Sequence, residues 1–430
     1  MNPLKTLMLV AVLALGWATS LAGAADKLVL TDGTEITGTI AQEVDGYVYF
    51  TYLKSGIEVQ EFFSPNDYVE VVRDAGKFAK ARDATPDQAA RPSIEKKSET
   101  KTRTIGSDAP RAAVISLGAG GDKNMVGMYI TAKKLRELIP VLEEEEIDVV
   151  VFRVNSGGGL LYELQFLHEV IQEEYKPRFR TVAWIESAIS AAAMTSHVIE
   201  EIYFMKRGNY GACTGWSGSL NAMKGEGLEQ VLHMMEKASD LGGYDHAIMR
   251  AMQINEPLSA TINDNGTVDF FLDTSGEILL NPGDYILTLA AEQAEEVKFS
   301  KGTTDDHREL GRLMGYNEID WVGETVPGIP YPVSKAEAEM RKFRDRTHRD
   351  EQRVNVYIAD FQRAFASAQG APAERRGAFV NQARRALRNI ERMVANNPNF
   401  ALLNLNLISD EEFRQWVRDR EEELRELSRR

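Results

Sequence analysis

The sequence predicts an α/β protein whose central domain consists of successive βαβ units, preceded by a small antiparallel β-barrel and followed by a helical C-terminal region. Three patterns predict this organisation: two-residue alternation over residues 27–73, apolar runs alternating with helical periodicity over residues 111–328, and charged helical periodicity over residues 334–430. With 430 residues, the chain is long enough for two or three structural units around a sizeable core.

Composition excludes several kinds of protein. The formal net charge of −15 argues against a general nucleic-acid-binding role. Cys213 is the only cysteine, which rules out an intrachain disulfide and a cysteine-based zinc site. The six histidines include no pair four residues apart, so histidine spacing gives no support for a metal site. We therefore expect neither a metal nor another cofactor.

The N-terminus has the pattern of a signal peptide over residues 1–24. Lys5 precedes an apolar run from Leu7 to Ala18, and Ala22-Gly23-Ala24 supplies small residues for cleavage. A run of about a dozen apolar residues is short for a transmembrane helix, which needs about 20. We expect export to the periplasm or the extracellular space, with an uncleaved membrane anchor as the alternative.

Residues 27–73 alternate apolar and polar side chains, as in Glu35–Ile40 and Tyr47–Tyr52. Asp32-Gly33 and Asp45-Gly46 are turn dipeptides typical of hairpins. This pattern predicts a small barrel of the SH3 or Sm-like kind, which we interpret as a docking or assembly module. Residues 74–110 show neither periodicity and are expected to form a flexible linker.

The central domain, residues 111–328, shows strands that alternate with helices. The expected strands are residues 112–117, 149–154, 181–185 and 201–205, and the expected helices are residues 131–146, 160–171 and 190–198. An insertion at residues 254–284 is predicted to form a β-hairpin arm from strands at 268–272 and 277–280. We assign no chemistry to this insertion.

Ser190 follows a strand at the start of a helix, and about thirty residues earlier another strand ends in Asn155-Ser-Gly-Gly-Gly159. A hydroxyl at a helix N-terminus gains from the positive end of the helix dipole. A glycine turn allows bare backbone N–H groups to approach a developing oxyanion. This pairing predicts a serine hydrolase, and the alternative is that Ser190 only caps the helix.

The order of these segments resembles the ClpP/crotonase superfold, and most closely the NfeD-type and signal-peptide-peptidase-A-type serine proteases. Asn155–Gly159 and Ala188–Ala192 occupy the places of the family's oxyanion turn and nucleophile. Arg207–Thr214 is similar to its Gly-Ala-x-Thr stretch, and Leu287–Ala294 is similar to its Leu-Thr-x-x-Glu-Ala segment. The resemblance covers roughly residues 112–326 and implies a spiral of βαβ units.

The resemblance also implies a set of active-site residues. Ser190 takes the place of the nucleophile, with Gly158, Gly159 and Ala191 around the oxyanion hole. Gly157 stands where the family has a proline. Glu186, at the end of the same strand as Ser190, is either a salt-bridge partner or a free carboxylate, and close to a lysine it would oppose a base role.

The expected general base is a lysine rather than a histidine. The loop of residues 206–217 contains no histidine, and His197 lies about two helical turns, roughly 10 Å, from Ser190. The family uses a lysine made neutral by burial. Lys224, just before an expected helix at residues 228–240, fits that place, and Lys237 and Lys206 are the alternatives.

The C-terminal region is predicted to be helical over residues 336–349, 354–368, 375–394 and 411–427. Asn396–Asn399 interrupts the pattern, and Ser409–Glu412 is a capping box for the last helix. We interpret these helices as a packing or oligomerisation appendage whose arginine-rich faces suit an acidic partner or the cell envelope surface.

Taken together, these features predict an exported serine endopeptidase with a Ser-Lys dyad that cleaves peptides or segments of envelope proteins. We expect a homo-oligomer, and an envelope protein partner that binds the N-terminal barrel or the C-terminal helices. Two alternatives remain. One is an inactive ClpP-like scaffold, in which Lys224 would point into solvent. The other is a crotonase-type acyl-CoA enzyme, which export disfavours because its cofactor is cytoplasmic.

Overall fold

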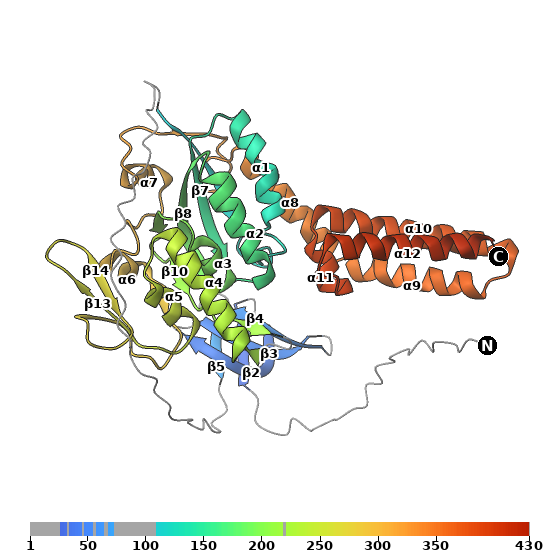
Figure 1. Ribbon diagram of the computed structural model, residues 1–430, viewed down its shortest axis with the longest axis horizontal. Helices are drawn as coiled ribbons and strands as arrows, with labels where there is room; N and C mark the ends of the chain where they lie inside the picture. The colour runs from blue at the N-terminus through green and yellow to red at the C-terminus, as the bar shows by residue number, and fades with distance from the viewer. Residues whose placement is uncertain are drawn as a thin grey trace. The chain divides into compact units, whose positions relative to one another are not determined.

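The computed structural model describes residues 26–31, 34–44, 47–54, 57–63, 68–72, 109–217 and 221–429, and it confirms a mixed α/β protein (Figure 1). The chain divides into two units, Met1–Lys101 and Thr102–Arg430. The expected signal peptide lies outside the described residues, as does nearly all of the expected linker. Within the ranges given above, none of the helices combines the length and apolar character of a membrane span.

The first unit contains one antiparallel sheet. Its strands are β1 (Asp26–Leu30), β2 (Glu35–Val44), β3 (Tyr47–Lys54), β4 (Ile57–Phe63) and β5 (Tyr68–Val72), in the order β4-β3-β2-β1-β5. Leu28, Val48 and Phe50 are fully buried in its core. The expected strands are confirmed. Closure into an SH3 or Sm-like barrel stays a prediction, because β4 and β5 are not paired with each other in the described residues.

The second unit is organised around a mainly parallel sheet in the order β16-β10-β8-β7-β6-β17, with β9 also paired to β8. Its strands are β6 (Arg111–Leu117), β7 (Val149–Ser156), β8 (Arg180–Ile189), β9 (Ile202–Phe204), β10 (Asn209–Gly211), β16 (Thr288–Ala290) and β17 (Asp320–Trp321). Strands β6, β7, β8 and β10 are parallel neighbours in chain order, whereas β16 runs antiparallel to β10. This arrangement brings the ends of β7, β8 and β10 together.

Both faces of the sheet are buried, and successive residues of each strand point to opposite faces. Val150 and Phe152 pack in one core with α1 (Ala132–Glu144), α2 (Leu164–Glu169) and α3 (Ala191–Ser196). Val149 and Val151 pack on the other face with α7 (His307–Leu313). The near-continuous apolar sequences of β6 and β7 follow from this two-sided burial.

The segment expected to be one helix at residues 160–171 is instead a composite. It comprises a 3₁₀ turn, η1 (Leu161–Glu163), then α2, and then a π-helical turn, η2 (Val170–Tyr175). Two further helices, α4 (Glu226–Gly242) and α5 (His246–Gln253), and the short α6 (Ala291–Glu296) complete this part. A two-stranded ribbon, β11 (Trp216–Ser217) and β12 (Asn221–Ala222), precedes α4.

The expected hairpin arm is wrong in its pairing. Strands β14 (Val268–Phe271) and β15 (Ile278–Asn281) lie on either side of a third strand, β13 (Leu258–Ile262), and do not pair with each other. The hairpin is formed by β13 and β14, since Ile262 pairs with Val268 across the Asp264-Asn-Gly turn. The short run of β13 directly after Pro257 gave little alternation to predict it from.

The C-terminal region is helical, as expected. It contains α8 (Lys335–Glu351), α9 (Val354–Gly370), α10 (Ala373–Asn396), α11 (Asn399–Leu405) and α12 (Asp410–Arg429), and α9, α10 and α12 run side by side (Figure 1). The Ser409 capping box is confirmed, because its hydroxyl accepts from the Glu412 N–H at 3.1 Å and the Glu412 carboxylate accepts from the Ser409 N–H at 3.2 Å. Helix α11, which follows directly on the Asn-Pro-Asn break, was not predicted.

Helix α8 belongs to the core of the sheet. Its Met340 and Phe343 are buried with α1 and α2. Glu337 accepts from the N–H of Ser116 on β6 at 2.8 Å, and Arg344 donates to the Ser116 carbonyl at 2.6 Å. Buried charges are tolerated where they are paired and hydrogen-bonded, as here. Helix α8 therefore ties the C-terminal helices to the sheet.

Candidate active site

Ser190 lies at the junction between β8 and α3 with a φ of +55° and a ψ of −128°. A positive φ is uncommon for a residue with a side chain, and such strained positions cost about 1–3 kcal/mol and cluster at functional sites. Hydrogen bonds hold the residue on both sides: its N–H donates to Gly211 at 2.8 Å, and its carbonyl accepts from Met194 at 3.0 Å. The fold therefore maintains a sharp turn at Ser190.

The Ser190 side chain does not cap α3. Its hydroxyl makes no capping hydrogen bond, although Ser190 occupies the N-cap position. Ser187, three residues earlier, also has a different use, because its hydroxyl donates to Asn209 Oδ1 at 2.9 Å. The interpretation of Ser190 as a simple helix cap is wrong. In the described part of the chain, no hydrogen bond occupies the Ser190 hydroxyl.

The glycine turn after β7 lies directly against Ser190. A Cβ atom added to Gly158, which has a φ of +106°, would lie 2.6 Å from the Ser190 Cβ. A Cβ atom on Gly159, with a φ of +152°, would lie 2.3 Å from the Val126 carbonyl oxygen. Only glycine meets both demands, left-handed backbone and close approach. This requirement explains the consecutive glycines in the sequence.

Two backbone N–H groups at this turn have no partner among the described residues. The segment around Val126 pairs with the turn, since the Val126 N–H donates to Gly158 at 2.8 Å and its carbonyl accepts from Leu160 at 3.0 Å. This pairing leaves the Gly159 N–H without an acceptor. The Ala191 N–H, at the first position of α3, is likewise not donated. Whether these two N–H groups serve an oxyanion belongs to the proposed function below.

The loop after β10 packs against the backbone at Ser190. Ala212 has a φ of +48°, and its N–H donates to Leu287 at 2.9 Å. Cys213 is fully buried, with its Sγ 3.7 Å from the Ser190 carbonyl oxygen. Burial raises the pKa of the Cys213 thiol, so this cysteine stays a neutral thiol and fills space beside the backbone of Ser190.

The candidate lysines are not in contact with Ser190. Lys224 follows the β11–β12 ribbon, where the Met223 N–H donates to the Gly215 carbonyl at 2.8 Å, so this lysine extends from the same loop system. Its side chain is exposed, as are those of Lys237 and Lys206. Among the described residues, no hydrogen bond or ion pair joins any of the three to Ser190.

The buried histidines are structural. His197 contacts the Tyr210 hydroxyl at 3.2 Å and the Ser239 hydroxyl at 3.0 Å, so both of its ring nitrogens are engaged in the core. His168 contacts the Met194 carbonyl at 2.9 Å. Burial lowers the pKa of His197 to about 3 and that of His168 to about 4. Among the described residues, neither histidine makes a hydrogen bond with Ser190.

Glu186 forms an ion pair with Arg153 on the neighbouring strand β7. It is therefore a salt-bridge partner in this structure and not a partner of the candidate lysines. Over the described ranges, no group of three or more histidine, cysteine, aspartate or glutamate side chains is arranged to hold a metal ion.

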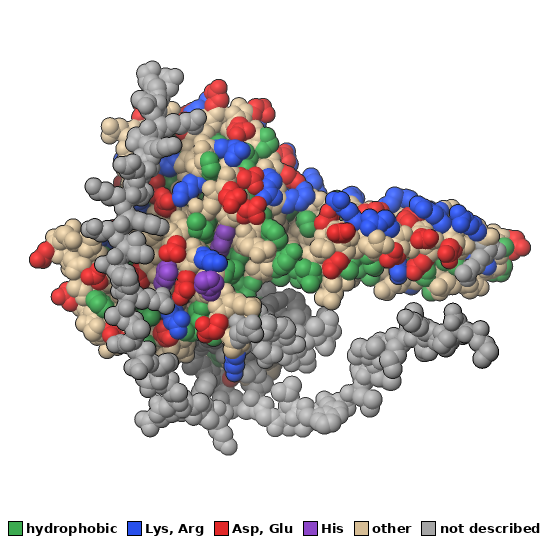
Figure 2. All heavy atoms as spheres, in the orientation of Figure 1, with side chains coloured by type: hydrophobic (Ala, Val, Ile, Leu, Met, Phe, Trp, Pro, Cys, Tyr) green, Lys and Arg blue, Asp and Glu red, His purple; other side chains and the backbone are tan. Residues whose placement is uncertain are grey.

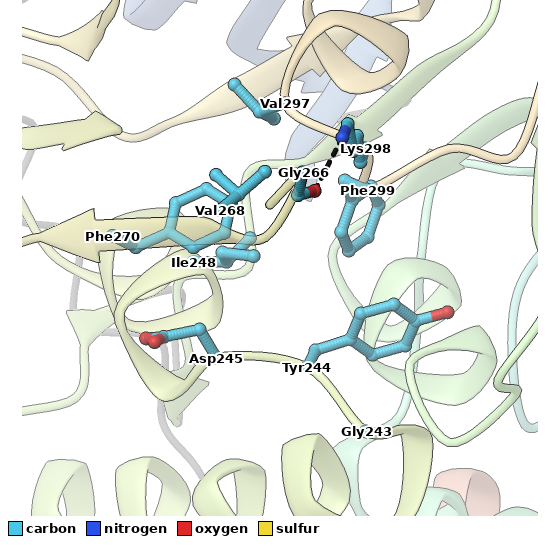
Figure 3. A pocket seen from close by; sticks show the side chains of 10 residues that line it. All are labelled: Gly243, Tyr244, Asp245, Ile248, Gly266, Val268, Phe270, Val297, Lys298 and Phe299. Atoms are coloured by element: carbon cyan, nitrogen blue, oxygen red, sulfur yellow. Dashed lines mark hydrogen bonds between the residues drawn. The ribbon is translucent and has the colours of Figure 1, made fainter. Parts of the chain in front are cut away.

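A separate pocket of about 250 Å³ lies between α5, β14 and the segment after α6 (Figure 3). Apolar side chains such as Ile248, Phe270 and Phe299 line it, and at one side Lys298 donates to the Gly266 carbonyl at 2.5 Å. Ser190, the glycine turn and the candidate lysines are not among its lining residues. No serine, threonine or cysteine is among its lining residues, so we do not assign serine-hydrolase chemistry to it.

No protein-family model matches this chain, and no curated protein sequence matches it. Solved structures similar to it include two mutants of the 1510-N membrane-bound stomatin-specific protease. A serine-to-alanine mutant is 13% identical over 53% of this chain and 94% of its own, with a TM-score of 0.36. A lysine-to-alanine mutant in complex with a substrate peptide is 12% identical over 55% and 99%, with a TM-score of 0.38. The 1510-N membrane protease specific for a stomatin homolog, from Pyrococcus horikoshii, is 12% identical over 50% and 93%, with a TM-score of 0.31. Likenesses this distant assign neither family nor activity, and the site stands on its own geometry.

Proposed function

We propose that this chain is an exported serine endopeptidase of the NfeD and signal-peptide-peptidase-A kind, with Ser190 as its nucleophile. One observation supports this most strongly: Ser190 is held at a positive φ against a glycine turn, and among the described residues neither its hydroxyl nor the N–H groups of Gly159 and Ala191 have a hydrogen-bond partner. A strained turn that presents a serine hydroxyl in this way is typical of serine hydrolases. The order of motifs along the chain agrees with this proposal.

In the proposed reaction, the Ser190 oxygen bonds to the carbonyl carbon of a peptide while its proton passes to Lys224. The resulting oxyanion accepts hydrogen bonds from the N–H groups of Gly159 and Ala191, beside Gly158. Collapse of the intermediate breaks the C–N bond, and the departing amine takes the proton. Water, deprotonated by the same lysine, then hydrolyses the acyl-enzyme ester.

A lysine base must be neutral, and burial is what lowers a lysine pKa. Because Lys224 is exposed in this structure, the proposed mechanism requires the loop after β12 to close over Ser190. Substrate or a neighbouring subunit of a homo-oligomer would bring about that closure. The proposed substrates are extended peptides or envelope-protein segments.

Exposed arginines give the C-terminal helices a surface for the proposed envelope partner. Figure 2 shows lysine and arginine side chains along one edge of the bundle of α9, α10 and α12. Arg385, Arg388 and Arg392 are exposed on α10 at spacings of three and four residues, which place them on one face. Guanidinium groups in a row suit carboxylate-rich or phosphate-rich partners.

The second candidate function is an inactive scaffold, and the exposure of Lys224 favours it. In a scaffold, the glycine turn and Ser190 would be a remnant of the fold, and the barrel and helices would organise partners. An acyl-CoA enzyme is a third possibility, which failure to bind an immobilised CoA ester would remove.

Labelling with a fluorophosphonate from about pH 6 to about pH 10 distinguishes the first two functions, because a lysine base becomes competent as it deprotonates. For the peptidase, wild-type labelling rises with pH and is lost in Ser190→Ala and Lys224→Ala. Ser187→Ala and Lys237→Ala are the matched controls and should label normally. A folded wild type that stays unlabelled at every pH, with and without peptide, would favour the scaffold.

A further inference from the structure

A short strap, residues 124–128, lies between the glycine turn and the C-terminal helices. It has no place in the proposed chemistry, and its residues supply none of the reacting groups. Nevertheless it contacts both the turn at Ser190 and a segment about 270 residues later in the chain, with side-chain bonds spanning sequence separations of 269 to 272 residues. The strap therefore connects two regions that the sequence keeps far apart.

On one side, the strap holds the turn through its backbone. Val126 makes the two hydrogen bonds to Gly158 and Leu160 described above, which bracket Gly159. Ser156 donates its hydroxyl to the Asn124 carbonyl at 2.5 Å. Gly127 lies so close to Leu160 that an added Cβ atom would come within 2.6 Å of that side chain. A movement of the strap would therefore move the turn.

On the other side, two buried asparagines from the break between α10 and α11 hold the strap. Asn399 Nδ2 donates to the Gly127 carbonyl at 2.7 Å, and Asn397 Nδ2 donates to the Met128 carbonyl at 2.9 Å and to that of Gly127 at 3.3 Å. Asn397 is fully buried and Asn399 is 4% exposed. The two buried side-chain amides thus donate to the backbone carbonyls of the strap.

A buried carboxylate completes this arrangement. Glu163, in the 3₁₀ turn that follows the glycines, accepts from Asn399 Nδ2 at 2.7 Å and from the Ala132 N–H at 2.8 Å. Met128, the last residue of the strap, and Tyr129, which follows it, pack in the same core as α9, α10 and α12. At the rim, the Tyr162 hydroxyl donates to the Ile408 carbonyl at 3.1 Å. The C-terminal region therefore contacts both the strap and the residues that follow the glycine turn.

We propose that Asn397 and Asn399 are positioning residues through which the C-terminal helices hold the oxyanion turn against Ser190. This inference rests on the proposed function for its effect on reactivity. It gives the C-terminal helices a role in setting the geometry of the site. A displacement where α10 ends and α11 begins would be transmitted through Gly127 and Val126 to Gly158 and Gly159.

Two readouts on the full chain test this proposal. Hydrogen exchange follows the Val126 and Leu160 amides, whose hydrogen bonds join the strap to the turn, and fluorophosphonate labelling follows Ser190. In Asn399→Ala, we expect exchange at both amides to quicken by about tenfold, as for loss of about one supporting hydrogen bond. Labelling should slow by about 10-fold to 100-fold, because sub-ångström misplacement is costly in catalysis.

Asn404→Ala is the matched control, because Asn404 lies on the same helix and, among the described residues, its side chain donates only to the Phe400 carbonyl within it, at 3.0 Å. Asn399→Ser is the milder variant to use if the alanine protein does not fold, since its hydroxyl keeps the site polar but is one bond shorter. Control behaviour indistinguishable from wild type, with both Asn399 readouts changed, supports the proposal.

Unchanged exchange in a folded Asn399 variant overturns the proposal. Faster exchange with unchanged labelling overturns the positioning role, because the turn would then be loosened without effect on Ser190. If wild type does not label, the proposed nucleophile fails, and exchange alone decides whether the asparagines hold the turn. The two proposals can therefore fail separately.

Discussion

Replacing Gly158 by alanine tests the closest contact in the candidate site. The new Cβ atom would lie 2.6 Å from the Ser190 Cβ, 3.0 Å from the Ile189 carbonyl oxygen and 3.1 Å from the Ala191 nitrogen, at a φ of +106°. Two of these neighbours are backbone atoms, so rotation of a flexible side chain cannot relieve the collision. The turn must instead move away from Ser190.

Gly121 provides the control that separates backbone strain from collision. It also has a positive φ, +83°, but an added Cβ atom would meet nothing within 4 Å. Gly121→Ala should therefore lower the free energy of unfolding by about 1–2 kcal/mol, the cost of a left-handed alanine. Gly158→Ala should lower it by about 2–5 kcal/mol, because overpacking adds about 1–3 kcal/mol.

Urea denaturation measures these free energies, and fluorophosphonate labelling of the folded variants measures the reactivity of Ser190. We expect labelling to fall by more than about tenfold in Gly158→Ala, because the oxyanion donors move with the turn, and to be unchanged in Gly121→Ala. Equal losses of stability in the two variants, or normal labelling of Gly158→Ala, would refute the close packing of the turn on the nucleophile.

Two further predictions concern stability. His168 and His197 have pKa values lowered from 6.5 to about 4 and about 3, so the unfolded chain binds protons first as the pH falls. The contribution of the two histidines to the free energy of unfolding is complete above about pH 6.5 and decreases below it. Together they should lower that free energy by about 3 kcal/mol between about pH 6.5 and about pH 5, whereas the raised pKa of buried Glu163 acts in the opposite direction. A free energy of unfolding that is the same at both pH values would contradict this prediction. Ser409→Ala removes the cap of α12 and should cost about 1 kcal/mol in urea denaturation, whereas Ser428→Ala, at the other end of that helix, should cost less; equal effects would argue against the cap.

Much of the fold could be predicted because its determinants are local. The near-continuous apolar run of β7 predicts a buried strand, and Ser409 followed three residues later by Glu412 predicts a helix start. Strand β13 and helix α11 are short, and each begins beside a proline, Pro257 or Pro398, which obscured them. The formation of β13 and α11 depends on tertiary contacts, which the periodicity of the sequence does not indicate.

The candidate site shows the same division. The positions of Ser190 and the glycines follow from a strand–turn–helix order, and the structure brings Gly158 and Ser190 into contact. The general base could not be predicted in the same way. A lysine can act as a base only in an environment that lowers its pKa, and the sequence does not show that environment. The link from Asn399 to Gly127 was also not predictable, since the Asn-Pro-Asn pattern indicates only a helix break.

The contacts of α8 also determine where the chain can be shortened for expression. A version that ends before Ser334 would lack Glu337 and Arg344, although both bond to the buried backbone of Ser116 on β6. It would also remove Met340 and Phe343 from the core around α1 and α2. A shortened form of the α/β portion must therefore retain at least α8, which ends at Glu351. Because Met128 and Tyr129 pack against the later helices and Asn399 pairs with buried Glu163, an intact interior requires those helices as well.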